Sequence, residues 1–168
     1  MIHTNVDSPI GPLLVTAEPD DGGPAITGVW TAGNIRRPGT DAGRADDTLS
    51  DIRTQLEQYF AGERQNFDVR LSPAGTAFQR RVWAALCTVE YARTVSYGWI
   101  ASSIGSPTAM RAVGGANGRN PISILVPCHR VVGANGLLTG YAGGMTAKRW
   151  LLEHELHHAG QGPAPLIT

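Results

Sequence analysis

The chain changes its type of sequence near residue 75, and this change limits the folds it can adopt. Before this point, short apolar runs separated by Gly, Pro and Asp predict strands over 1–6, 13–17 and 25–30. After it, short segments begin at a Ser or Thr cap and end at a glycine, as helices do. The sequence therefore predicts an α+β protein with one domain over 1–75 and a second, mainly helical domain over 76–168.

The first domain is expected to be a small antiparallel sheet covered by one helix. Apolar residues recur at helical spacing from Leu49 to Phe60 and stop at Gly62. Residues 31–47, rich in Gly, Arg and Asp, predict a loop. Residues 67–72 alternate like a strand and lead into Pro73-Ala74-Gly75, where we place the boundary.

The second domain contains a predicted helix-turn-helix. The run Thr76-Ala77-Phe78-Gln79 is a capping box and predicts a helix after it. Segments 96–105 and 106–118 each begin at Ser and end at Gly, and Pro107 suits the first position of the second helix. That helix consists mostly of small residues, and its single long cationic side chain is Arg111, so it could approach a nucleic-acid groove closely. The alternative is that Arg111 is an ordinary solvated arginine.

The net charge of zero hides two halves of opposite sign. Residues 1–75 hold 6 basic and 11 acidic residues, a net of −5, while residues 76–168 hold 8 and 3, a net of +5. Between Tyr91 and Leu152 the chain has no acidic residue but six cations, namely Arg93, Arg111, Arg119, Arg130, Lys148 and Arg149. This pattern predicts a surface that meets a polyanion, although a genome that favours Arg would also produce it.

Several classes of protein are excluded. No apolar run approaches the roughly 18 to 20 residues of a membrane span, and no signal segment opens the chain, so a soluble cytoplasmic protein is expected. Only Cys87 and Cys128 occur, without a CxxC pair, which excludes a disulfide framework and a cysteine zinc site. Cys87 follows an apolar helical stripe and is expected to be a buried structural residue.

Cys128 lies in the segment with the strongest chemical signal. Residues 122–126 predict a buried strand that ends at Pro127, so Cys128 would emerge where regular structure stops. A thiol beside His129 and Arg130 is expected to have a lowered pKa and to be reactive, although a structural thiol remains the alternative. Neighbours on a strand point to opposite faces, so Cys128 and His129 need a kink or a bridging water to cooperate.

A last helix over 146–159 carries the third candidate for this chemistry. If Glu155 faces inward, it could orient His129 in a Cys-His-Glu relay. His154 and His158 stand four residues apart, but no third ligand is evident, so a solvated helix end is expected rather than a metal site.

A set of ordered motifs identifies a known family. The segment Pro127-Cys128-His129-Arg130-Val131-Val132, preceded by 111–114 and 116–121 and followed by Gly140-Tyr141-Ala142-Gly143-Gly144, closely resembles the O6-alkylguanine-DNA alkyltransferases, or methylated-DNA–protein-cysteine methyltransferases. The resemblance covers essentially all of 76–168. The pattern of residues 1–75 is similar to the family's more variable, ribonuclease H-like N-terminal domain.

The resemblance implies direct DNA repair without turnover. The damaged base is flipped out of the duplex, because its O6 substituent cannot be reached inside the stack. The alkyl group of O6-alkylguanine, and also of O4-alkylthymine, then passes irreversibly and stoichiometrically to Cys128, with no cofactor and no metal. His129 would take the thiol proton through a water, Glu155 would hold the histidine, and Asn120 would support this network. Tyr97 would rotate the phosphate and donate a proton to the leaving guanine oxygen.

The resemblance also implies a partner and a binding mode. The partner is double-stranded DNA, bound through its minor groove by a monomer, and cooperative binding along DNA stays open. Arg111 would enter the stack in place of the flipped base. Backbone contacts would come from Tyr97, Gly98, Ser106 and Ala134, and the base pocket from Val126, Val131, Tyr141, Ala142 and Gly143.

Two positions depart from the family pattern, and two other functions compete. Ala142 replaces a serine of some members, and Trp99 stands where a polar residue is common. Cys at position 128, rather than Trp, disfavours the non-catalytic binders of the same fold. A helix-turn-helix regulator would need dimer symmetry and longer side chains on its recognition helix. A cysteine hydrolase would account for Cys128, His129 and Glu155 but would not explain the DNA-binding features of the basic half.

Overall fold

The N-terminal strands form a mixed sheet with an antiparallel centre. The computed structural model describes residues 1–41, 43–160 and 166–167. Strands β1 (Ile2–Val6), β2 (Leu13–Glu18) and β3 (Ala25–Trp30) pair antiparallel, as predicted. The short strands β4 (Gly43–Arg44) and β5 (Arg70–Leu71) add in parallel at the two edges, in the order β4-β1-β2-β3-β5. The predicted loop over 31–47 therefore contains one strand, and the predicted strand over 67–72 shortens to two residues.

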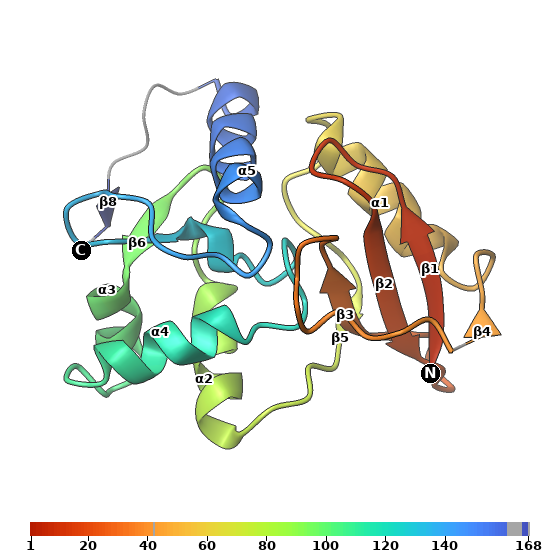
Figure 1. Cartoon of the computed structure of the whole chain (residues 1–168), viewed down its shortest axis with the longest axis horizontal. Helices are drawn as coiled ribbons and strands as arrows, with labels where there is room; N and C mark the ends of the chain where they lie inside the picture. The colour runs from red at the N-terminus through yellow and green to blue at the C-terminus, as the bar shows by residue number, and fades with distance from the viewer. Residues whose placement is uncertain (42, 161–165, 168) are drawn as a thin grey trace.

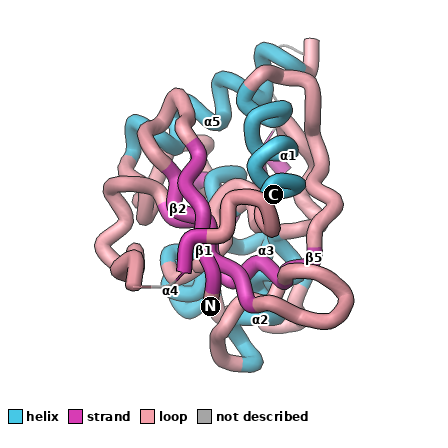
Figure 2. The backbone as a smooth tube through the Cα atoms, turned by 90° about the vertical axis from the view of Figure 1, so that its right-hand side faces the viewer, coloured by secondary structure: helices cyan, strands magenta, loops and turns pink. Residues whose placement is uncertain are grey.

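One helix accompanies this sheet, as the apolar spacing predicted. Helix α1 (Ser50–Phe60) buries Ile52, Leu56 and Tyr59 on one side. Viewed with the N-terminal half toward the reader, α1 lies beside the strands and the helices of the C-terminal half lie behind them (Figure 2). Tyr59 is completely buried, and its position near the end of α1 directs it toward the second half of the chain.

The C-terminal half begins with three short helices. Helix α2 (Ala77–Leu86) has the predicted capping box between Thr76 and Gln79. Helix α3 (Tyr97–Ser103) is capped by the Ser96 hydroxyl, which accepts from the Trp99 N–H at 3.0 Å. Helix α4 (Met110–Gly118) begins later than predicted. Its expected cap, Ser106, instead closes a turn in which the Ala109 N–H donates to the Ser106 carbonyl, so Pro107 precedes the helix.

A small parallel sheet and a long helix complete this half (Figure 1). Strand β6 (Thr94–Ser96) lies between β7 (Val131–Val132) and β8 (Leu166–Ile167). Helix α5 (Met145–His158) matches the predicted last helix within a residue. Within the described residues, no helix is long and apolar enough to cross a bilayer.

The strand predicted over 122–126 is wrong. These residues form an irregular buried segment in which Ile124 has a φ of 74°, a value that no strand residue adopts. The segment makes only isolated bridges, one of them from Ile122 to Val29 of β3. The Val29 N–H donates to the Pro121 carbonyl at 2.9 Å, and the Ser123 N–H donates to the Val29 carbonyl at 3.1 Å. The N-terminal sheet therefore holds the segment that leads into Cys128.

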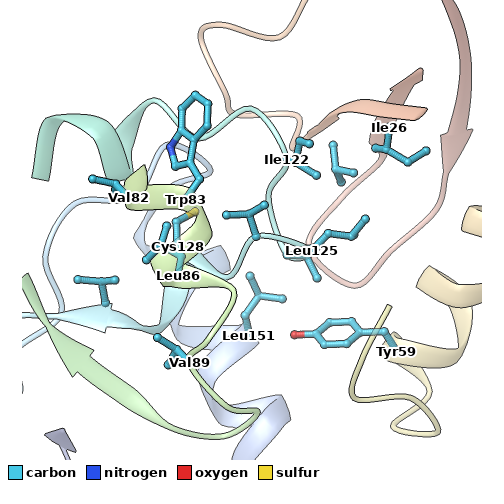
Figure 3. Packing of buried hydrophobic residues seen from close by; sticks show 14 of the residues in the cluster. Ile26, Tyr59, Val82, Trp83, Leu86, Val89, Ile122, Leu125, Cys128 and Leu151 are labelled. Carbon is cyan, nitrogen blue, oxygen red and sulfur yellow. The ribbon is translucent and has the colours of Figure 1, made fainter. Parts of the chain in front are cut away.

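The buried apolar residues form one cluster that crosses between the two halves. Around Cys128 it includes Val82, Trp83 and Leu86 of α2, and farther out it includes Ile26 of β3 (Figure 3). Cys87, expected to be buried beside this stripe, is instead exposed and directly follows Leu86, the last residue of α2.

Candidate active site and nucleic-acid interface

Cys128 begins a single 3-10 turn, η1 (Cys128–Arg130), that supplies the kink the sequence required. The side chain is 3% exposed. Asn120 fixes the backbone before it, because its Nδ2 donates to the Val126 carbonyl at 2.8 Å and its Oδ1 accepts from the Ile122 N–H at 3.0 Å. Asn117 Nδ2 lies 3.4 Å from the Cys128 carbonyl oxygen. The backbone around Cys128 is thus held by two asparagines, one from the end of α4 and one from the segment after it.

Glu155 is the centre of the hydrogen-bond network beneath the thiol. Its fully buried carboxylate accepts five hydrogen bonds, at 2.7 to 3.1 Å, from His129 Nε2, the Tyr59 hydroxyl, the Ala92 N–H, and Arg130 Nε and Nη2. The donors come from α1, η1 and the segment before β6. Glu155 faces inward, as the relay hypothesis required, and it touches His129 directly.

Burial and these hydrogen-bonded contacts set the charge states of Glu155 and His129. Burial alone would raise the pKa of Glu155, but His129 and Arg130 outweigh it and hold that pKa well below its usual range. Burial lowers the pKa of His129, although Glu155 opposes the shift. His129 is therefore neutral near pH 7, and its Nε2 carries the proton donated to the carboxylate. Among the described residues, Nδ1 has no hydrogen-bond partner, so it is available as a base.

The expected lowering of the Cys128 pKa is wrong for the DNA-free protein. Burial raises the pKa of the Cys128 thiol, while Asn120 and Lys148 act in the opposite direction. Arg130, which the sequence placed beside the thiol, is instead committed to Glu155. The resting thiol therefore keeps its proton, and a base must remove that proton during the reaction.

Lys148, which the sequence placed only among the cations of the predicted polyanion surface, is a residue of the Cys128 site. It is completely buried, and its Nζ donates to the Val131 carbonyl at 2.6 Å and to the Thr139 carbonyl at 3.1 Å. Burial lowers the pKa of Lys148 to about 8. The sequence could have indicated this position, because residues 148, 151 and 155 are spaced so that they share one face of a helix.

A groove on the outer side of this half brings together most of the residues predicted to contact DNA. It encloses about 470 Å³ and is lined by Tyr97 and Gly98 of α3, by Arg111 of α4 and by Ala134. The Tyr97 hydroxyl lies 2.6 Å from Thr139 Oγ1. Ser106 does not line the groove and lies in the turn between the two helices. Trp99 is half-buried against the apolar cluster, so its departure from the family pattern is accommodated by packing.

The predicted base-pocket residues fall into two groups. Val126 and Val131 are buried beside Cys128, whereas Tyr141, Ala142 and Gly143 form a half-buried loop. A Cβ on Gly143 would lie 2.8 Å from Thr31 Oγ1, so only glycine allows this loop to approach the N-terminal half so closely. Burial raises the pKa of Tyr141 well above its usual range, and a Cys128 thiolate would add to this shift.

The basic surface is smaller than the six cations suggested. Arg130 and Lys148 are buried, whereas Arg111, Arg119 and Arg149 are exposed and Arg93 is half-buried. The expected solvation of His154 is also wrong. This side chain is buried, its Nε2 donates to the Tyr59 carbonyl at 2.7 Å, and its ring stacks on Trp150.

The sequence of each half matches a domain of a known protein family. Residues 1–73 match the ribonuclease-like domain of 6-O-methylguanine DNA methyltransferase, and residues 77–157 match the DNA binding domain of the same protein. The fold and the buried Cys-His-Glu arrangement thus define a protein of two parts, with its candidate nucleophile in the part that matches the DNA binding domain. The chain belongs to the 6-O-methylguanine DNA methyltransferase family.

Individual relatives agree over almost the full length. Methylated-DNA–protein-cysteine methyltransferase of Mycobacterium bovis is 50% identical over 161 residues, covering 95% of each chain. The protein of the same name from Methanosarcina acetivorans is 46% identical over 155 residues, covering 92% of this chain and 98% of that one. The crystal structure of Mycobacterium tuberculosis OGT in complex with DNA superposes with a TM-score of 0.87 at 47% identity, covering 98% and 96% of the two chains.

Proposed function

We propose that this protein repairs alkylated DNA by moving an alkyl group from O6 of guanine, or O4 of thymine, onto its own Cys128. The observation that carries the proposal is the buried Cys128 beside a neutral His129 held by Glu155, in a chain whose α3 and α4 form a groove. Family membership supports the same chemistry. Because the protein supplies its own acceptor, each chain reacts once and needs no cofactor.

The reaction balances with the groups in place. Cys128 Sγ attacks the alkyl carbon and forms the S–C bond as the C–O6 bond breaks. The electron pair of that bond stays with the guanine. His129 Nδ1 receives the thiol proton through a water molecule, and the Tyr97 hydroxyl supplies a proton to the leaving base. The net result is a thioether on Cys128 and a restored guanine that carries the proton from Tyr97. The proton held by His129 then returns through water to the Tyr97 oxygen, so that both side chains are neutral again.

DNA binding is assigned to the face that carries the groove. We propose that α4 enters the minor groove as part of a monomer, since its small residues allow close approach and Arg111 can fill the place of the flipped base. The backbone contacts are assigned to Tyr97, Gly98, Ser106 and Ala134. A free, buried nucleophilic thiol suits a reducing compartment such as the cytoplasm. We also assign residues 1–75 and 76–168 to separate domains.

The test is intact-protein and peptide mass spectrometry after mixing the protein with excess duplex that carries one O6-methylguanine. The expected result is a gain of one methyl group per chain, on the peptide that contains Cys128. Binding without any gain would indicate a damage sensor or a regulator. Turnover of an ester or amide without methyl gain would indicate a cysteine hydrolase. Either outcome overturns the proposal.

Arg111→Ala should slow repair of duplex DNA about tenfold or more and leave the reaction with free O6-benzylguanine within about twofold. Extruding a base costs a few kcal/mol of stacking and pairing, and each 1.4 kcal/mol is worth a factor of ten in rate. Only the duplex reaction includes that cost. The measurement is the single-turnover rate on each substrate.

Arg149→Ala is the matched control for this prediction. Arg149 is exposed on α5 and does not line the groove, so its removal takes away the same charge elsewhere. If Arg111→Ala slows both substrates equally, or if the two variants behave alike on duplex DNA, Arg111 does not replace the extruded base.

A further inference from the structure

One of the five hydrogen bonds to Glu155 comes from the N-terminal half of the chain. The Tyr59 hydroxyl, from the last turn of α1, donates to Glu155 Oε1 at 2.8 Å. The same oxygen accepts from His129 Nε2 at 2.7 Å and from Arg130 Nη2 at 2.9 Å. Figure 3 shows Tyr59 reaching away from α1 toward Leu151 of α5, with the hydroxyl at its leading end.

The ring of Tyr59 is fixed independently of its hydroxyl. The side chain is completely buried, and its centroid lies 5.3 Å from that of Phe60, 5.5 Å from Phe67 and 6.3 Å from Tyr91. Aromatic contacts of this kind hold a ring in place without any polar partner. The hydroxyl is therefore held at Glu155 by aromatic packing from both halves of the chain, since Tyr91 and His154 of the C-terminal half also pack on the ring, and removing the oxygen leaves the ring where it is.

We propose that Tyr59 is a positioning residue for alkyl transfer, through which the ribonuclease-like half sets the basicity of His129. This inference rests on the proposed function of the Cys128 site. By donating to Oε1, the phenol draws charge from the oxygen that His129 uses. It also restricts rotation of the carboxylate, so that Nε2 keeps the proton and Nδ1 remains the base. Tyr59 touches no substrate and acts only through Glu155.

The direction of the effect follows from these contacts. Without the phenol, Oε1 becomes a stronger acceptor for His129 and stabilises the imidazolium more. His129 would then be protonated at a higher pH and would be lost as a base there. The other titratable and charged groups near the pair are Tyr91 before β6, Cys128 and Arg130 of η1, Tyr141, and Lys148 and His154 of α5.

The experiment compares Tyr59→Phe with Tyr91→Phe. Tyr91 packs against the same ring, but within the described part of the chain its hydroxyl has no hydrogen-bond partner. Two quantities are measured across pH: the single-turnover rate of methyl transfer, and the His129 imidazole signals in ¹⁵N-labelled protein. For Tyr59→Phe we expect the rate near pH 7 to fall about three- to tenfold, in line with the net contribution of one ordinary hydrogen bond. We expect the acid limb and the His129 titration to move to higher pH.

Each outcome decides the proposal. Tyr91→Phe is expected to leave both curves in place, and the thermal midpoints of both variants should stay close to that of the parent. If Tyr59→Phe lowers only the thermal midpoint, or slows the reaction without moving the His129 titration, Tyr59 is a packing residue and the inference is wrong. If the parent accepts no methyl group, the proposed function fails, yet the His129 titration still decides whether Tyr59 tunes the histidine.

Discussion

Cys128→Ser is expected to abolish methyl transfer and to leave binding to duplex DNA intact. A serine hydroxyl is almost never ionised near neutral pH and is a far weaker nucleophile than a thiolate. Serine fits the 3% exposed position, since it differs from cysteine only in the smaller atom on Cβ. The groove of Tyr97, Gly98, Arg111 and Ala134 does not include residue 128, so DNA contacts should persist. The measurement is mass gain per chain together with a binding titration.

Cys87→Ser is the matched control for this prediction. Cys87 is an exposed residue at the end of α2, but partial burial of its thiol raises the pKa of that group, so little of it is thiolate at neutral pH. This variant should accept one methyl group per chain at the parental rate. A methyl group found on the Cys87 peptide of Cys128→Ser would move the chemistry away from the buried site.

Glu155→Gln is expected to be the most destabilising single change at the site. The amide cannot balance the charge of Arg130, whose side chain is 8% exposed, and its NH₂ group would face donors. Breaking a buried ion pair by removing one partner costs about 3–5 kcal/mol. For a chain of this size we expect the thermal midpoint to fall by roughly 10 °C. Methyl transfer should also slow, because His129 loses the carboxylate that orients it.

The pH dependence of stability gives this prediction a second readout. The folded-state pKa of Glu155 lies below its ordinary value, so the unfolded chain binds more protons in acid. The stability due to Glu155 is therefore fully present above about pH 4.5 and is lost as the pH falls below it. The gap in stability between the parent and Glu155→Gln should narrow on acidification. Urea unfolding at pH 7 and pH 4 measures this gap.

Glu153→Gln provides the control on the same helix. Glu153 is exposed and lies two residues before Glu155. Glu153→Gln therefore removes the same charge without touching the buried network. Its stability should stay within about 0.5 kcal/mol of the parent, as for most surface substitutions. Equal losses in the two variants would show that charge on α5, rather than the buried pair, is responsible.

The sequence determined features that depend on neighbours along the chain. The capping box of Thr76 and Gln79, the Ser96 cap and the apolar spacing of α1 all involve residues three or four positions apart, and each formed as predicted. The ordered motifs around Cys128 likewise identified the family, because they lie in one short stretch. Predictions from local sequence were wrong where hydrogen bonds to other segments compete. Ser106 closes a turn instead of capping α4, and residues 122–126 bridge to β3 instead of forming a strand.

The tertiary structure alone decided the electrostatics of the site. Arg130 follows His129 in sequence and was expected to lower the pKa of the thiol, but its Nε and Nη2 donate to Glu155, 25 residues away. The Tyr59 hydroxyl donates to the same carboxylate from a position 96 residues away, and no sequence motif predicts this contact. Burial then reverses the expected shift at Cys128. The physical reason is that desolvation and ion pairing depend on what surrounds a group in space, whereas sequence shows only what stands beside it along the chain.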